Sequence, residues 1–383
     1  MTGPLAGVRV VELAGIGPGP FAAMMLADMG AEVVRVDRVA DVRDRPPGPH
    51  PDVVLRGRRS MAVDLKRPEG RQLVLDLASR SDALLEGFRP GVAERLGLGP
   101  EDLRAVNPRL VYGRITGWGQ DGPLATAAGH DIGYIAVTGA LNGSRRAGDR
   151  PVPPMNLLGD MGGGGMMLAF GLVCALLEAG RSGHGQVVDA SIVDGTAALS
   201  NFILGLRNTG AWPAPAGGNL LDTGAPFYEV YECADGREVA VGALEPKFYA
   251  ELLRLSGMDG VPELAPDRRS DPATWPAAKR RWAEVFASRT RDEWAAVFEG
   301  TDACVAPVLD WDEAAAHPQL TARETYVREN GVVQSAPAPR FDRTAATLGL
   351  PPPHPGEHTA ELLAELGRGP DAVAALRAAG AVA

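Results

Sequence analysis

The sequence of 383 residues contains few cysteines, few aromatic residues and no long hydrophobic run. Its three cysteines, Cys174, Cys233 and Cys304, are far apart and form no Cys-x-x-Cys pair. A disulfide framework or a zinc ribbon is therefore not expected, and this cysteine usage is typical of a cytoplasmic protein. The longest uncharged run lies between Asp160 and Glu178 and is just short of a membrane span, which favours a buried helix and no membrane partner.

Basic residues are also in deficit, with 38 Lys and Arg against 48 Asp and Glu, so the net charge is −10. This balance argues against a nucleic-acid partner. One segment reverses the balance: residues 35–71 contain ten basic and six acidic side chains. The basic ones are Arg35, Arg38, Arg43, Arg45, Arg56, Arg58, Arg59, Lys66, Arg67 and Arg71. Such an island suits a polyphosphate ligand, because guanidinium groups match phosphate oxygens, and it equally suits a solvated face without a ligand.

Apolar β-branched segments alternate with helical segments along the first 115 residues. We expect strands at 8–13, 32–37, 62–65, 83–86 and 110–114, and helices at 21–29 and 71–78. Strands separated by helices of about ten residues predict a parallel sheet with crossover helices. The sequence therefore predicts an α/β fold with a Rossmann-like large domain.

The pattern changes near residue 190. Residues 211–218 have the composition of a linker, and Asp235-Gly236 lies between two apolar segments, which is typical of a β-hairpin. Helical segments rich in Ala, Trp, Glu and Arg follow as far as about Gly300. This part of the chain is expected to form a second, smaller α+β domain.

A glycine-rich turn, residues 15–20, follows the first expected strand and opens a helix. With Asp37 about twenty residues further on, it is superficially similar to the dinucleotide-binding fingerprint. That fingerprint needs glycine where this chain has Pro20, and Arg38 suits a phosphate better than a ribose hydroxyl. A tight turn between strand and helix is therefore favoured over nicotinamide binding.

Two further segments carry groups that can move protons. Gly129-His130-Asp131 is one, although a lone histidine is more often structural, and neighbours in an extended segment point opposite ways. The other is Asp160, followed by four glycines at 162–165. Asp160 can be a helix N-cap, but the glycines indicate that something approaches this backbone closely, as at a site for a developing oxyanion.

Five segments together resemble a known family. They are Leu5–Leu13, Gly117–Pro123, the triplet at 129–131, Gly159-Asp160 and Gly183–Asp189. In this order they are similar to the family III CoA-transferase superfamily and, within it, to the α-methylacyl-CoA racemases of bacterial type. The resemblance covers almost the whole chain.

The resemblance implies a catalytic set. His130 and Asp160 match the acid/base pair, Glu245 matches the glutamate that hydrogen-bonds the histidine, and Asp131 lies beside the thioester. CoA is part of the acyl-CoA substrate in this family, so no separate cofactor and no metal is expected.

The resemblance also implies a set of CoA-contacting positions. They are Arg38, Val63, Asp64, Leu65, Lys66, Gly87, Phe88, Arg89, Arg95, Gly129, Ile132, Gly133 and Tyr134. Phe88 stands where a tyrosine is expected. Residues 39–54 do not match the family pattern, and the role of that loop stays open.

The fold implied by the resemblance is an interlocked homodimer. Residues 1–190 and 336–383 form the large CoA-binding domain, 224–318 the small domain, and 191–223 and 319–335 the linkers. Each active site lies between the large domain of one subunit and the small domain of the other. Glu245 and Tyr228 are then expected to reach His130 of the partner subunit.

The implied reaction inverts the α-carbon of 2-methylacyl-CoA thioesters by 1,1-proton transfer through an enolate. Matched proton affinities require the Asp160 pKa to be well above its usual value. Apolar neighbours raise that pKa and a helix N-terminus lowers it, and the sequence does not decide between them. One alternative is a CoA transferase in which Asp160 forms an acyl anhydride. Another is a CoA-binding protein without catalysis.

Overall fold

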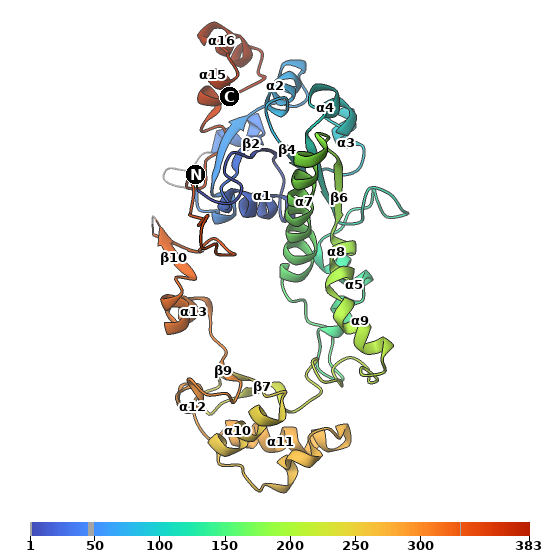
Figure 1. Ribbon diagram of the computed structural model, residues 1–383, viewed down its shortest axis with the longest axis vertical. Helices are drawn as coiled ribbons and strands as arrows, with labels where there is room; N and C mark the ends of the chain where they lie inside the picture. Colours follow the sequence, from blue (N-terminus) through green and yellow to red (C-terminus); the bar gives the residue numbers. More distant parts are fainter. Residues whose placement is uncertain (1, 45–49, 330) are drawn as a thin grey trace. The chain divides into compact units, whose positions relative to one another are not determined.

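Six segments of the chain form one parallel sheet, which confirms the α/β class (Figure 1). The computed structural model describes residues 2–44, 50–329 and 331–383. The strands are β1 (Arg9–Leu13), β2 (Glu32–Asp37), β3 (Arg58–Ala62), β4 (Ala83–Glu86), β5 (Val111–Thr116) and β6 (Val187–Ser191). Their order is β3-β2-β1-β4-β5-β6, so the direction of winding reverses between β1 and β4.

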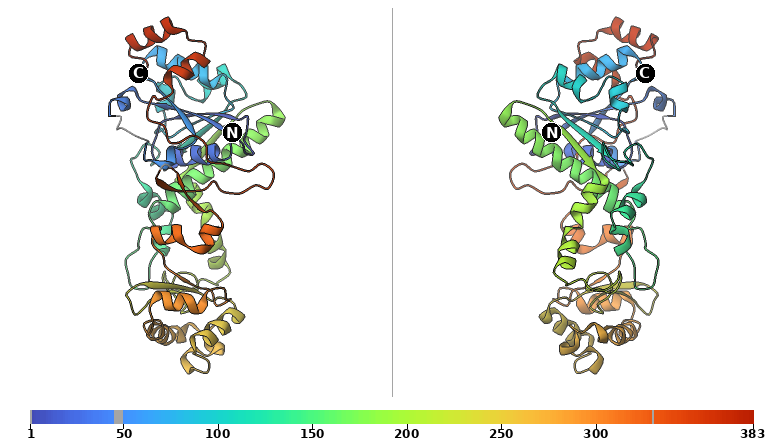
Figure 2. Two further views of the ribbon diagram at one scale, coloured as in Figure 1. Left: turned by 90° about the vertical axis from the view of Figure 1, so that its left-hand side faces the viewer. Right: turned by 90° about the vertical axis from the view of Figure 1, so that its right-hand side faces the viewer.

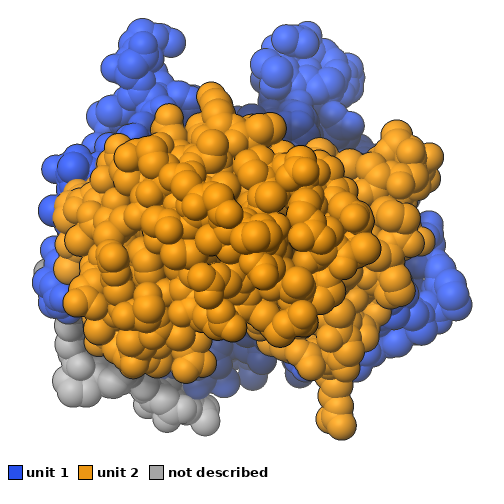
Figure 3. Space-filling model, turned by 90° about the horizontal axis from the view of Figure 1, so that it is seen from below, with its two compact units in different colours: residues 1–138, 155–199, 321–383 blue, residues 139–154, 200–320 orange. Residues whose placement is uncertain are grey.

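The chain divides into two compact units, which are coloured separately in Figure 3. Unit 1 comprises residues 1–138, 155–199 and 321–383, and unit 2 comprises 139–154 and 200–320.

Helices cover both faces of the sheet in unit 1, as crossover connections require (Figure 2). On one face, α1 (Pro18–Asp28) and α7 (Met167–Ser182) bury Leu26, Leu168 and Leu172 against alternate strand residues. On the other, α2 (Pro68–Ala78) and α15 (Thr359–Glu365) bury Leu73, Leu77, Leu362 and Leu363. Unit 1 also contains the 3-10 helices η1 (Val39–Asp44) and η2 (Val53–Leu55), α3 (Val92–Arg95), α4 (Pro100–Val106), α5 (Asp131–Val137), the π-helix η3 (Leu157–Met166), α8 (Ile192–Leu199), the hairpin β10–β11 (Tyr326–Glu329, Val332–Ser335) and α16 (Pro370–Ala378).

The strand expected at 62–65 is misplaced, because β3 occupies Arg58–Ala62. Its first residues are charged and do not have the composition of a buried strand. Arg58 is nevertheless fully buried, since its guanidinium pairs with Glu12 of β1 at 2.6 Å. A buried ion pair across the sheet explains why the apolar pattern failed here.

The apolar run after Asp160 belongs to one continuous helix, Leu157–Ser182, in which η3 leads into α7. By length and composition this helix could cross a membrane. An 18-residue stretch of it has a mean hydropathy of 1.6, and 39% of that stretch is buried inside the protein. The prediction of a buried helix holds for one face only. Phe170 and Leu177 on the other face are 68% and 58% exposed.

Unit 2 contains a three-stranded antiparallel sheet of order β7-β8-β9. The hairpin predicted around Asp235-Gly236 is confirmed, with Tyr228 opposite Gly242. An aromatic core that includes Trp282, Phe286 and Trp294 packs against the sheet. Its strands and α-helices are α6 (Ala140–Gly143), α9 (Asn201–Asn208), β7 (Tyr228–Glu232), β8 (Glu238–Gly242), α10 (Pro246–Ser256), α11 (Trp275–Phe286), α12 (Arg291–Phe298), β9 (Val305–Pro307) and α13 (Trp311–Ala316), and α14 (Pro318–Ala322) leads back to unit 1.

Candidate active site

Three of the predicted CoA-contacting segments begin where a parallel strand ends. Arg38 follows β2, Val63–Lys66 follows β3, and Gly87–Arg89 follows β4. The carboxyl ends of parallel strands meet at one edge of the sheet, and ligands of such sheets bind there, beside the point where the winding reverses. The structure thus brings these segments to one edge, with the side chains of Arg38, Lys66 and Arg89 exposed.

The other predicted residues near this edge are held by the fold itself. Val63 is 1% exposed and forms a bridge with Val382, and the Asp64 carboxylate accepts the backbone N–H of Lys66. Phe88 and Leu65 pack against the sheet core on the α2 side. Arg95 is exposed at the last residue of α3.

The basic island is partly an internal structural network. Arg56 makes two hydrogen bonds to the carboxylate of Asp28, of 2.9 and 2.6 Å, and both side chains are buried. Arg35 and Arg58 pair with Glu12, and Arg59 pairs with three surface glutamates. Arg38 and Lys66 remain exposed, whereas residues 45–49 of the unmatched 39–54 loop, Arg45 among them, lie outside the described residues. The basic residues of this island are therefore partly buried in ion pairs, and a smaller number of them are exposed.

His130 and Asp131 stand at the start of α5 and point to different surroundings. His130 is the N-cap residue in extended conformation and is exposed, and no hydrogen bond to its ring is found within residues 2–44, 50–329 and 331–383. Asp131 is 8% exposed, and its Oδ1 accepts the backbone N–H of Asp160 at 2.7 Å. A Cβ atom at residue 159 would lie 2.3 Å from that oxygen, so the contact requires Gly159.

The carboxyl group of Asp160 is half-buried beside these two residues. Burial is the main factor that raises its pKa, and the negative charge of Asp131 raises it further. The side-chain amide of Asn156, 3.4 Å from Asp160 Oδ2, and the charge of His130 lower it. The net shift is upward, which answers the question that the sequence left open.

Asn156 and Gly17 were missed by sequence reasoning. Asn156 lies four residues before Asp160, a spacing that places two side chains on one helical face. A Cβ atom at Gly17, in the glycine-rich turn before α1, would lie 3.5 Å from Asp160 Oδ2. The sequence carries no signal that joins residue 17 to residue 160, because they meet only in the fold.

The four glycines after Asp160 allow two helices to approach the π-helix. A Cβ atom at Gly163 would lie 2.6 Å from Thr196 Oγ1 of α8, and one at Gly164 3.0 Å from Pro18 of α1. Gly165 similarly leaves room for Phe21. The close approach predicted from these glycines is therefore made by α8 and α1.

The ring of Tyr134 occupies the space next to Gly117 and Gly129, where other residues would place a side chain. A Cβ atom at Gly117 would lie 2.0 Å from its ring and one at Gly129 2.6 Å from it. Trp118 packs edge-on at 4.8 Å between ring centroids. Ile132 and Gly133, in the first turn of α5, follow directly, and Ile132 is 51% exposed.

Glu245 and Tyr228 both belong to unit 2. Glu245 is exposed at the N-cap of α10, and Tyr228, at the first residue of β7, is 37% exposed.

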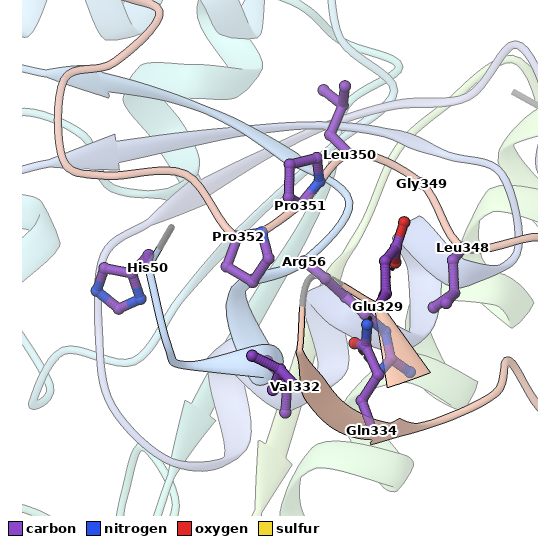
Figure 4. A pocket seen from close by; sticks show the side chains of 11 residues that line it. His50, Arg56, Glu329, Val332, Gln334, Leu348, Gly349, Leu350, Pro351 and Pro352 are labelled. Atoms are coloured by element: carbon purple, nitrogen blue, oxygen red, sulfur yellow. Dashed lines mark hydrogen bonds between the residues drawn. The ribbon is translucent and has the colours of Figure 1, made fainter. Parts of the chain in front are cut away.

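A separate pocket in unit 1 is lined by none of the predicted site residues. Its walls include His50, Arg56, Glu329, Gln334 and Pro352 (Figure 4). Arg56 donates to Gln334 there, and its charge is already balanced by the Asp28 pair. Across the described part of the chain, no group of three or more His, Cys, Asp or Glu could hold a metal ion.

Comparison with known proteins shows the family to which the chain belongs. Residues 5–359 match the model of CoA-transferase family III, and the chain therefore belongs to that family. It is 48% identical to a mouse protein and 47% identical to a human protein, both named alpha-methylacyl-CoA racemase, over 95% of this chain and 93% of theirs. A crystal structure of a CAIB/BAIF family protein from Brucella suis superposes with a TM-score of 0.80 at 26% identity, over 96% of this chain and 100% of that one.

Proposed function

We propose that the protein is an α-methylacyl-CoA racemase, an isomerase that inverts the α-carbon of 2-methylacyl-CoA thioesters. The observation that carries this proposal is the pairing of an exposed imidazole, His130, with a carboxyl of raised pKa, Asp160, at one site. The mouse and human relatives at nearly half identity bear that activity in their names.

Inversion at carbon needs a proton removed from one face and another delivered to the opposite face. Neutral imidazole with protonated Asp160 serves one enantiomer, and imidazolium with carboxylate serves the other. The raised pKa of Asp160 brings the proton affinities of the two groups closer together, which favours transfer in both directions. Backbone N–H groups near residues 129–131 stabilise the enolate between the two steps.

The CoA moiety binds at the carboxyl edge of the sheet in this proposal. Arg38, Lys66, Arg89 and Arg95 are exposed there or close by, and cationic side chains bind phosphate oxygens strongly.

We also propose that the active form is a homodimer in which Glu245 of one subunit reaches His130 of the partner subunit. Several large apolar side chains support this, since they are more than 60% exposed in the single chain. They are Phe170, Val137, Phe202 and Trp311. Exposed apolar groups of this size are typical of surfaces that another chain covers.

The test is incubation of one pure 2-methylacyl-CoA enantiomer in D₂O. We expect deuterium at the α-carbon together with loss of optical purity. If the thioester keeps both its α-proton and its configuration after incubation with the unmodified protein, the proposal is contradicted.

Family membership makes a CoA transferase the second candidate. In that reaction the Asp160 carboxylate attacks the thioester and carries an acyl anhydride, which hydroxylamine traps. His130 argues against this role, because the transferase has no evident use for a second base there. Hydroxylamine-dependent labelling of Asp160, with no α-exchange, would support the transferase and overturn the racemase.

A further inference from the structure

The turn between β1 and α1 forms one side of the Asp160 site, and the proposed function gives it no role. A Cβ atom at Gly17 would lie 3.5 Å from Asp160 Oδ2, and Gly17 has a φ of 70° that favours glycine. This turn follows β1, at the point where the order of the sheet reverses. The glycine turn thus lies directly against the carboxyl group that is proposed to carry the proton.

Buried groups hold this turn in place from beneath. The guanidinium of Arg35 donates to the carbonyl of Gly15 at 3.4 Å, and that of Arg58 donates to the carbonyl of Pro20. Both arginines pair with the same buried carboxylate, Glu12. Each end of the turn is therefore tied to one ion network within the sheet.

The π-helix holds the turn from the side. Gly164 and Gly165 have no side chains, so the π-helix that carries Asp160 packs directly on Pro18 and Phe21. The turn and Asp160 consequently form one packed arrangement within unit 1.

Ile16 occupies the tip of this turn and is 86% exposed, more than any other large hydrophobic residue of the described chain. A single exposed apolar residue is ordinary on a protein surface. This one differs because it stands between two glycines, on an anchored turn, next to the residue that approaches Asp160. An exposed apolar side chain is thus carried one residue away from the contact between Gly17 and Asp160.

We infer that Ile16 is a specificity-determining residue that limits the size of the substituent on the substrate α-carbon. The inference rests on the proposed racemase function. Proton transfer requires the α-carbon to come within hydrogen-bond reach of the Asp160 carboxyl. Its substituents then lie against the turn, where Gly17 contributes no side chain and Ile16 supplies the apolar surface.

The experiment compares two acyl-CoA thioesters of equal chain length, one with a 2-methyl and one with a 2-ethyl group. The measured quantity is the ratio of their kcat/KM values for α-deuterium exchange. A single methylene in an apolar contact changes such a ratio by roughly tenfold or more. Ile16→Ala is expected to raise the 2-ethyl to 2-methyl ratio about tenfold, and Ile16→Phe to lower it by a similar factor.

Val106→Ala is the matched control, because Val106 is an apolar residue, 41% exposed, at the end of α4. The 2-ethyl to 2-methyl ratio of this variant should equal that of the unmodified protein. If the Ile16 variants also keep that ratio while the unmodified protein is active, the specificity role is wrong and the racemase function stands. If the unmodified protein exchanges neither thioester, the function fails and the inference fails with it.

Discussion

At the scale of single residues, the neighbours of Asp160 decide how tightly it holds a proton. Burial and the carboxylate of Asp131 favour the protonated form, whereas the amide of Asn156 and the charge of His130 favour the ionised form. The carboxylate of Asp131 also accepts a hydrogen bond from the backbone N–H of Asp160. One aspartate therefore both positions the second and raises its pKa.

Asp160→Asn tests this balance. Exchange should fall by at least about 10²-fold, the usual contribution of a general acid or base. A pKa that is higher in the folded than in the unfolded state gives stability below the unfolded value, and this stability is lost as pH rises through the folded value. Thermal unfolding between pH 4 and 8 should therefore show less loss of stability with rising pH in the variant. An identical pH dependence in both proteins would contradict the raised pKa.

Asn156→Ala removes a donor that stabilises the ionised carboxylate. The pKa of Asp160 should rise further, so the limb of the kcat/KM profile that belongs to Asp160 should move to higher pH. Asn208→Ala, at an exposed position at the end of α9, is the control and should leave the profile in place. A shift to lower pH in the Asn156 variant would disprove the contact.

At the scale of elements, the site depends on how closely α1, α5 and α8 pack around the π-helix. Glycines make each of these approaches: Gly159 for α5, Gly163 for α8 and Gly164 for α1. The glycine run is a poor helix former, and its contribution is instead the close packing of the three helices.

Gly159→Ala should disrupt the contact between α5 and the π-helix. The added methyl group would lie 2.3 Å from Asp131 Oδ1 and 2.8 Å from Ile135, and such overpacking costs about 1–3 kcal/mol. We expect a lower denaturation midpoint together with loss of exchange activity. Gly180→Ala in α7 meets open space and should instead stabilise the protein by up to about 1 kcal/mol. Equal effects of the two substitutions would contradict the packing.

Local pattern predicted the elements that follow it closely. The strands β1, β2, β4 and β5 and the β7–β8 hairpin were predicted near their observed bounds, because apolar alternation and an Asp-Gly turn specify them locally. β3 was misplaced, since Arg58 is buried through an ion pair with Glu12, a residue 46 positions away. Likewise Asp131 and Gly17 meet Asp160 through tertiary contacts that no spacing indicates, whereas the four-residue spacing of Asn156 and Asp160 does indicate one helical face.

At the scale of the whole molecule, several large apolar side chains are exposed in the single chain. Phe170 and Leu177 stand on the open face of α7, and Phe202 is 66% exposed on α9. In the proposed homodimer, a second copy of the chain covers this surface and supplies Glu245.

Phe170→Asp should weaken that homodimer. A charge in an apolar interface is expected to raise the dimer dissociation constant at least about tenfold, equivalent to roughly 1.4 kcal/mol. Light scattering across a dilution series measures the dissociation, and activity should fall in parallel with the dimer fraction. Val106→Asp, on the exposed part of α4, should change neither quantity. A fully active Phe170→Asp monomer would contradict the shared site.

The central claim is that His130 and Asp160 act on opposite faces of one carbon. The most direct measurement follows α-deuterium incorporation into each pure enantiomer by His130→Ala and by Asp160→Ala. Both variants should lose inversion, and any exchange that remains should be confined to one enantiomer, a different one for each variant. Inversion that persists in either variant, or residual exchange of the same enantiomer in both, would contradict the claim.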